Sequence, residues 1–162
     1  MPDVDKTLLI EAAVARLTEE VQALRESARQ TREGATHEES RAENDKDTRG
    51  LEASYLARGQ AARVEETEDA VTRLSYLELR SFGPDDPIAL SALVTVDVDG
   101  AERHYFHVPA AGGQRLQAGG VEVQLLTPVS PVGRALIGKH AGDGFELKLA
   151  GGVREYEVIE VR

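Results

Sequence analysis

The hydrophobic pattern of this chain changes its period near residue 84, and that change divides the sequence into two halves. In the first half apolar residues recur every three or four positions, at Ile10, Val14, Leu17, Val21, Leu24 and Ala28. This spacing is typical of a heptad seam on an α-helix. A second, weaker seam follows at Ala57, Ala61, Val64, Thr67, Val71 and Leu74. Because the stretch between the seams is polar, we expect residues 1–80 to form an antiparallel coiled-coil helical hairpin.

In the second half, apolar and polar residues alternate, which predicts β-strands. Asp99-Gly100 predicts a tight turn between two of these strands, and Gly151-Gly152 predicts another. Ser130 and Pro131 together indicate the start of a short helix. The expected strands and helix are 92–98, 103–108, 121–126, 145–149, 155–161 and the helix 131–137. The sequence therefore predicts an α+β protein, with a small, mostly antiparallel sheet domain at residues 84–162 after a linker at 82–87.

The charge of the chain restricts its partners. Its formal net charge is −10, and it contains no cysteine. Affinity for nucleic acid comes largely from Lys and Arg, so free-standing DNA or RNA binding is disfavoured and a partner with a basic surface is favoured. A disulfide framework and a thiolate metal site are excluded. The N-terminal residues do not have the pattern of a signal peptide, and no apolar run reaches the length of a membrane span. We expect a cytoplasmic protein with no membrane partner.

Three segments resemble the GreA/GreB family of bacterial transcript-cleavage factors. They are Thr127–Lys139 (TPVSPVGRALIGK), Leu51–Arg58 (LEASYLAR) and Glu155–Val161 (EYEVIEV). The resemblance implies an FKBP-like C-terminal domain that docks at the secondary channel of bacterial RNA polymerase, and a monomeric factor whose coiled coil enters that channel. It also implies that acidic residues at the coiled-coil tip help to hold a catalytic Mg²⁺ of the polymerase. The polymerase then cleaves its own backtracked RNA, and the factor has no activity alone.

The expected tip is an acidic stretch at residues 37–47, with five acidic and two basic residues. Family members that stimulate cleavage have an Asp and a Glu three residues apart, shortly before the tyrosine that Tyr55 matches. Alignment on Tyr55 places Thr48 and Leu51 at those two positions, and a shift by one residue places Asp47 and Gly50 there. The expected pair is therefore absent at its usual spacing. We predict that Asp45 and Asp47, followed by Glu43, support the metal ion. The alternative is a solvated loop on a channel-binding regulator or inhibitor that does not stimulate cleavage.

Basic residues and one turn complete the predicted site. Arg25, Arg29 and Arg32 fall on one helical face. By the resemblance they form a basic patch that faces the RNA 3′ end, and the alternative is an ordinary charged helix face. The resemblance also assigns polymerase docking to the predicted turn, at Ser130, Pro131, Gly133 and Arg134.

Two other function classes are open to a chain of this pattern. An FKBP-like domain suggests a prolyl isomerase, but such enzymes need an aromatic-lined pocket. From residue 82 onward the chain has only five aromatic residues and no Trp, so isomerase activity is not expected. The other class is a structural coiled-coil protein that does not bind polymerase.

Overall fold

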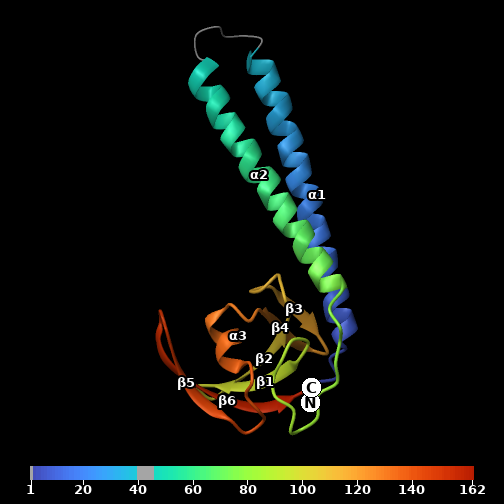
Figure 1. Cartoon of the computed structure of the whole chain (residues 1–162), viewed down its shortest axis with the longest axis vertical. Coiled ribbons are helices and arrows are strands. Elements are labelled where there is room, and N and C mark those ends of the chain that lie inside the picture. The colour runs from blue at the N-terminus through green and yellow to red at the C-terminus, as the bar shows by residue number, and fades with distance from the viewer. Residues whose placement is uncertain (1, 40–45) are drawn as a thin grey trace. The chain divides into compact units, whose positions relative to one another are not determined.

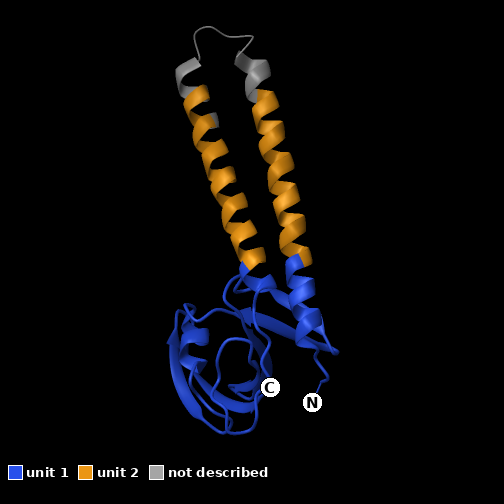
Figure 2. Cartoon of the chain, turned by 45° about the vertical axis from the view of Figure 1, so that its right-hand side comes forward, with its two compact units in different colours: residues 1–14, 73–162 blue, residues 15–72 orange. Residues whose placement is uncertain are grey.

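The computed structural model describes residues 2–39 and 46–162, without the side chains of residues 35–39, 46–49 and 53. The chain forms two compact units, which Figure 2 shows in different colours. Unit 1 comprises Met1–Val14 and Arg73–Arg162, and unit 2 comprises Ala15–Thr72. Long helices and a six-stranded mixed sheet confirm the predicted α+β class. Within the described part of the chain, no helix is long and apolar enough to cross a membrane.

Unit 2 is formed by parts of two antiparallel helices, α1 (Lys6–Glu39) and α2 (Lys46–Ser75), which lie side by side in Figures 1 and 2. The start of α1 up to Val14 and the end of α2 from Arg73 belong to unit 1. An ion pair of 2.8 Å joins Arg63 to Glu20, and Arg25 forms an ion pair with Glu68. Farther along α1, the Gln60 amide donates a hydrogen bond of 3.1 Å to the Ser27 hydroxyl. Residues 20–27 of α1 thus lie opposite residues 60–68 of α2.

The buried side chains of α1 agree with the predicted seam, whereas those of α2 differ from it at one position. All six seam residues of α1 are buried or half-buried. In α2, Ala61 was predicted to face inward but is exposed, and Gln60 is half-buried in its place. At about 100° per residue, Gln60 and Ala61 lie on opposite sides of Ala57 and Val64, and Ala61 borders a groove that Ala28 of α1 also lines. The α2 seam therefore includes the polar Gln60, which bonds to Ser27 of α1 and which an apolar pattern alone does not predict.

Unit 1 is built on one six-stranded sheet with the strand order β3-β4-β2-β1-β6-β5. The pairing of β2 with β4 is parallel, and the other four pairings are antiparallel. The strands are β1 (Leu93–Val98), β2 (Ala101–His107), β3 (Arg115–Ala118), β4 (Val121–Leu126), β5 (Gly144–Leu149) and β6 (Gly152–Val161). The sequence pattern did not predict β3, because its four residues lie between two glycine pairs that indicate turns.

A short helix, α3 (Pro131–Leu136), covers one face of this sheet, as Figure 1 shows. Leu136 of α3 is fully buried and packs with the inward-facing Val94 and Val96 of β1 and Val158 of β6. Burial of a side chain of this size contributes about 1.5–3 kcal/mol. The predicted turn between β1 and β2 is present, with positive φ at Asp99 (52°) and Gly100 (85°). The sheet and α3 thus form one core, which fixes the loop that leads into α3.

Candidate functional site

The predicted metal-supporting acids fall in the sequence between Glu39, where α1 ends, and the first turn of α2. Glu43 and Asp45 are outside the described residues. Asp47 is the second residue of α2, and its side chain is also outside the description. Among the described residues, no group of three or more His, Cys, Asp or Glu side chains is placed to hold a metal ion. The acidic tip therefore stays a prediction.

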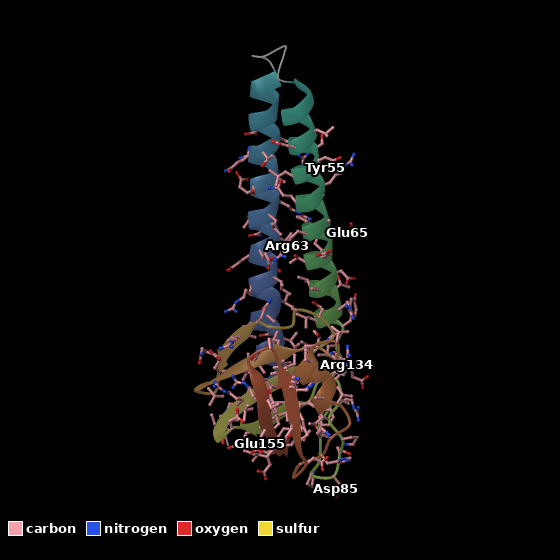
Figure 3. The ribbon with its side chains drawn as sticks, turned by 90° about the vertical axis from the view of Figure 1, so that its left-hand side faces the viewer. Tyr55, Arg63, Glu65, Asp85, Arg134 and Glu155 are labelled. Atoms are coloured by element: carbon pink, nitrogen blue, oxygen red, sulfur yellow. The ribbon has the colours of Figure 1, made fainter. Side chains whose placement is uncertain are left out.

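Next to the acidic stretch, α2 presents apolar side chains to solvent. Leu51 is 59% exposed and Tyr55 is 62% exposed. The two residues are four positions apart on α2, so they share one helical face, and Figure 3 shows Tyr55 projecting from the helix. In the alignment on Tyr55, Leu51 falls at the position of the expected second carboxylate, and in the alignment shifted by one residue Gly50 falls there. This helical turn therefore offers apolar surface beside the predicted acidic tip.

The predicted basic patch divides into two parts. Arg25 and Arg32 line a groove of about 580 Å³ along the helix pair, together with Arg58 of α2. Glu65 and Glu68 of α2 also line this groove, and Glu68 pairs with Arg25. Arg29 instead forms ion pairs of 2.7 Å with Glu26 and Glu33 on its own helix. Hydrogen bonding to Arg29 lowers the pKa of Glu26, and the same contacts raise the pKa of Arg29. The structure thus brings Arg25 and Arg32 together, adds Arg58, and leaves Arg29 in a separate surface network.

Ser130 and Gly133 determine the backbone conformation of the predicted docking turn. Ser130 caps α3, because its hydroxyl accepts a hydrogen bond of 3.1 Å from the Gly133 amide and donates one of 2.9 Å to the Thr127 carbonyl. Gly133 is buried, and a Cβ atom added to it would lie 2.0 Å from the Thr127 carbonyl oxygen. These two residues therefore shape the turn.

The outer surface of the turn is formed by other residues. Pro131 and Arg134 are exposed, and Figure 3 shows Arg134 at the surface of α3. Val129 is 77% exposed, a large value for an apolar side chain. An exposed Pro, Val and Arg on a rigid turn form a small surface that is suited to a protein partner. Sequence reasoning missed Val129, although its position between two prolines indicated an exposed turn.

A buried histidine supports this turn from the sheet. His107, the last residue of β2, is fully buried, and its Nε2 lies 3.4 Å from the Gly133 carbonyl oxygen. Because a carbonyl oxygen accepts hydrogen bonds, Nε2 carries the proton. Burial lowers the pKa of His107 to about 4, and the hydrogen bond to Gly133 opposes this shift in part. The sequence gave no signal for this role, since a single histidine in a strand is not distinctive.

The stability of unit 1 should fall on mild acidification because of His107. Its pKa is about 4 in the folded chain against an ordinary value of 6.5. The unfolded chain therefore binds more protons between these values, and the contribution of His107 is complete above pH 6.5 and is lost as the pH falls toward 4. From pH 7 to pH 5.5 the expected loss is about 1 kcal/mol. Denaturant unfolding of the wild type and of His107→Gln, which cannot titrate, measures this. Equal losses in the two proteins over this range would contradict the assignment.

The chain is similar to known proteins over its C-terminal part. Residues 84–162 match the family model described as "Transcription elongation factor, GreA/GreB, C-term". A relative named transcription elongation factor GreA from Rhodospirillum rubrum is 36% identical over 101 residues, which cover 62% of this chain and 60% of the relative. A GreA from Mesorhizobium japonicum is 31% identical over 111 residues, which cover 68% of this chain and 66% of the relative. The matched region thus spans somewhat less than two thirds of the length of these relatives.

Two solved structures are similar over different shares of the chain. The GreA factor homolog 1 (Gfh1) of Thermus thermophilus is 25% identical, with a TM-score of 0.40, over 92% of this chain and 94% of that chain. The elongation factor GreA/GreB of Nitrosomonas europaea is 23% identical, with a TM-score of 0.36, over 59% of this chain and 77% of that chain.

Proposed function

Through residues 84–162 this chain belongs to the GreA/GreB family of transcription elongation factors, and we propose that it binds bacterial RNA polymerase in the secondary channel. There it stimulates cleavage of backtracked RNA. The observation that carries the proposal is the family match over residues 84–162, which includes the built turn from Thr127 to Arg134. The factor has no catalytic activity alone and acts as a monomer in the cytoplasm.

The two units have separate tasks in this proposal. In unit 1 an FKBP-like domain docks on the polymerase through the exposed Val129, Pro131 and Arg134. In unit 2 the helices form a coiled coil that enters the channel. At 34 residues and 1.5 Å per residue, α1 is about 50 Å long. A helix pair of this length is long and thin enough to extend into a narrow channel. The chain's net charge of −10 also suits a channel with basic walls.

The tip carboxylates supply the chemistry of the proposal. Hydrolysis of a phosphodiester by a two-metal site uses Mg²⁺ to activate the attacking water and to stabilise the leaving oxygen. Mg²⁺ prefers oxygen ligands, so Asp45, Asp47 and Glu43 are the residues we propose to contribute at the polymerase active site. Arg25 and Arg32 would face the RNA 3′ end from the groove on the helix pair, where their guanidinium groups balance the charge of the RNA backbone.

A second function is favoured by one observation. Leu51 is exposed and apolar. The alignment on Tyr55 puts Leu51, and the shifted alignment puts Gly50, where the resemblance expects the Glu of a cleavage-stimulating tip. A factor with the same body and this altered tip would occupy the channel and regulate or inhibit the polymerase without stimulating cleavage. The two functions share the binding site and differ only in the reaction.

A binding experiment tests the polymerase binding that both functions require. Labelled protein is titrated with the core RNA polymerase of its own bacterium, and an established secondary-channel ligand is then added as competitor. The proposal predicts binding that the competitor displaces. Binding that persists would place the protein elsewhere on the polymerase, and no binding would favour a structural helical protein.

A further inference from the structure

A second surface of unit 1 has the properties of a protein-docking site. It is a groove of about 590 Å³ where the chain leaves α2, and its walls include Arg73, Tyr76, Arg80, Ala89, Leu90 and Pro109. Tyr76 is 85% exposed and Leu90 is 38% exposed. We call this surface the Tyr76 groove. Large apolar side chains next to arginines are the composition that is enriched at protein interfaces.

The walls of the Tyr76 groove are held by contacts from several parts of unit 1. The Arg80 amide donates a hydrogen bond of 2.9 Å to the hydroxyl of Ser91, which is fully buried. The Arg80 carbonyl accepts one of 2.7 Å from the Lys6 ammonium at the start of α1. The Leu77 amide donates to the Leu74 carbonyl at 3.2 Å, which fixes the turn that ends α2. The groove is therefore preformed, which reduces the entropy lost on binding.

Positive charge is concentrated beside this groove, on a chain that is strongly acidic. The Lys6 ammonium lies 4.8 Å from the centre of the Phe82 ring, and the Arg80 guanidinium lies 5.1 Å from it. Burial and the nearby charges of Arg162 and Arg80 lower the pKa of Lys6 to about 8. Among the described residues, Lys6, Arg73, Arg80 and Arg162 form no ion pair with a carboxylate, whereas Arg25, Arg29 and Arg63 do. Glu78 is the acidic residue that lines the groove.

Charge and apolarity together select the class of partner. A cluster of cations without paired carboxylates favours a negatively charged ligand. Nucleic acid is disfavoured, because the whole chain repels a polyanion and the groove wall of Tyr76, Ala89, Leu90 and Pro109 offers apolar surface that phosphates do not use. An acidic protein segment with an apolar side chain matches both features.

We propose that the Tyr76 groove docks a segment of RNA polymerase that carries carboxylates beside an apolar side chain. The carboxylates face Arg73 and Arg80, and the apolar side chain packs on Tyr76 and Leu90. This contact rests on the proposed function and adds a second attachment, separate from the turn at residues 127–134. Two attachments on unit 1 fix the direction in which the factor approaches the polymerase, which a single turn does not.

Site-specific crosslinking tests the proposal. The full chain carries the photoreactive p-benzoylphenylalanine at Tyr76, or at the control position Val153, which is 59% exposed on β6. Each protein is mixed with purified core polymerase, co-elution on gel filtration is recorded, and the crosslinked peptide is identified by mass spectrometry. We expect a crosslink from Tyr76 to a polymerase peptide rich in Asp and Glu, and little from Val153.

Other outcomes of this experiment overturn the inference. Co-elution without a Tyr76 crosslink, or a crosslink to nucleic acid or to a second copy of the chain, excludes an acidic polymerase segment and leaves the proposed function intact. Absence of co-elution for the unmodified chain overturns the proposed function and this inference with it.

A charge reversal gives a second, independent readout. Arg80→Glu should weaken polymerase binding by about tenfold, since it places a carboxylate against the partner's carboxylates. The matched control is Lys148→Glu on β5, which changes the net charge equally at an exposed position outside the groove and should leave the affinity within about twofold. Equal weakening by the two substitutions, with both proteins folded, would show a general charge effect and contradict the proposal.

Discussion

Replacing both Asp45 and Asp47 with alanine is expected to reduce stimulated RNA cleavage to the rate of the polymerase without the factor. The physical reason is the need of a two-metal site for oxygen ligands around its second ion. Once the two carboxylates are gone, Glu43 alone cannot supply an equivalent set. Polymerase binding should be nearly unchanged, because the proposed docking turn belongs to unit 1 and the substituted residues belong to the sequence of unit 2. The measurement is the rate of cleavage in halted, backtracked complexes, with affinity measured separately.

A matched control separates charge from chemistry in this experiment. Glu66 and Asp69 are exposed acids on α2, and their replacement with alanine removes the same charge from the same helix. This control variant should keep cleavage stimulation. If the Asp45 and Asp47 variant lost polymerase binding as well, those residues would be structural or docking residues. If it kept full cleavage stimulation, Glu43 or another acid of the stretch 37–47 would be the functional group.

Gly133→Ala is expected to destabilise unit 1 by about 3 kcal/mol or more. The new Cβ would lie 2.0 Å from the Thr127 carbonyl oxygen and 2.7 Å from the Ser130 hydroxyl oxygen. One of these atoms belongs to the backbone, and both take part in the cap of α3, so neither moves without breaking the Ser130 hydrogen bonds. The clash outweighs the higher helix propensity of alanine, which is worth about 1 kcal/mol. Denaturant unfolding measures the loss.

Gly59→Ala is the control for this substitution. Gly59 lies in α2, and a Cβ atom there would have no neighbour within 4 Å. The change should therefore stabilise the helix pair by about 0.5–1 kcal/mol through helix propensity alone. A Gly133→Ala protein with wild-type stability would show that the turn at residues 127–134 relaxes easily, and the account of it as a rigid docking element would be wrong.

The sequence was sufficient to predict most of the fold because each half has a strong local pattern. The α1 seam and the Asp99-Gly100 turn are set by local spacing and by backbone preference, and the structure has both. The pattern failed where a tertiary contact decides. Gln60 occupies the α2 seam because its amide reaches Ser27 on the other helix, and a propensity argument does not include that contact. The short strand β3 exists because β4 pairs with it, residue by residue.

The candidate site was predictable to a smaller extent. The sequence identified the turn from its two prolines and its serine, but it could not separate the residues that build the turn from those that face solvent. Gly133 and Ser130 belong to the first kind, and Pro131 and Arg134 to the second. His107 and the Tyr76 groove depend on residues far apart in the chain, so no local motif indicates them. Likewise, the spacing of Arg25, Arg29 and Arg32 did not reveal that Arg29 pairs on its own helix.

A transcript-cleavage assay with the polymerase of the same bacterium decides whether this protein stimulates cleavage. Halted, backtracked elongation complexes with labelled RNA are incubated with Mg²⁺, with and without this protein. The account predicts faster release of short 3′ RNA fragments when the protein is present. If the protein binds in the secondary channel and release is not accelerated, cleavage stimulation is contradicted, and the altered tip, which lacks the expected pair of acids at its usual spacing, becomes the reason that the protein regulates without cleaving.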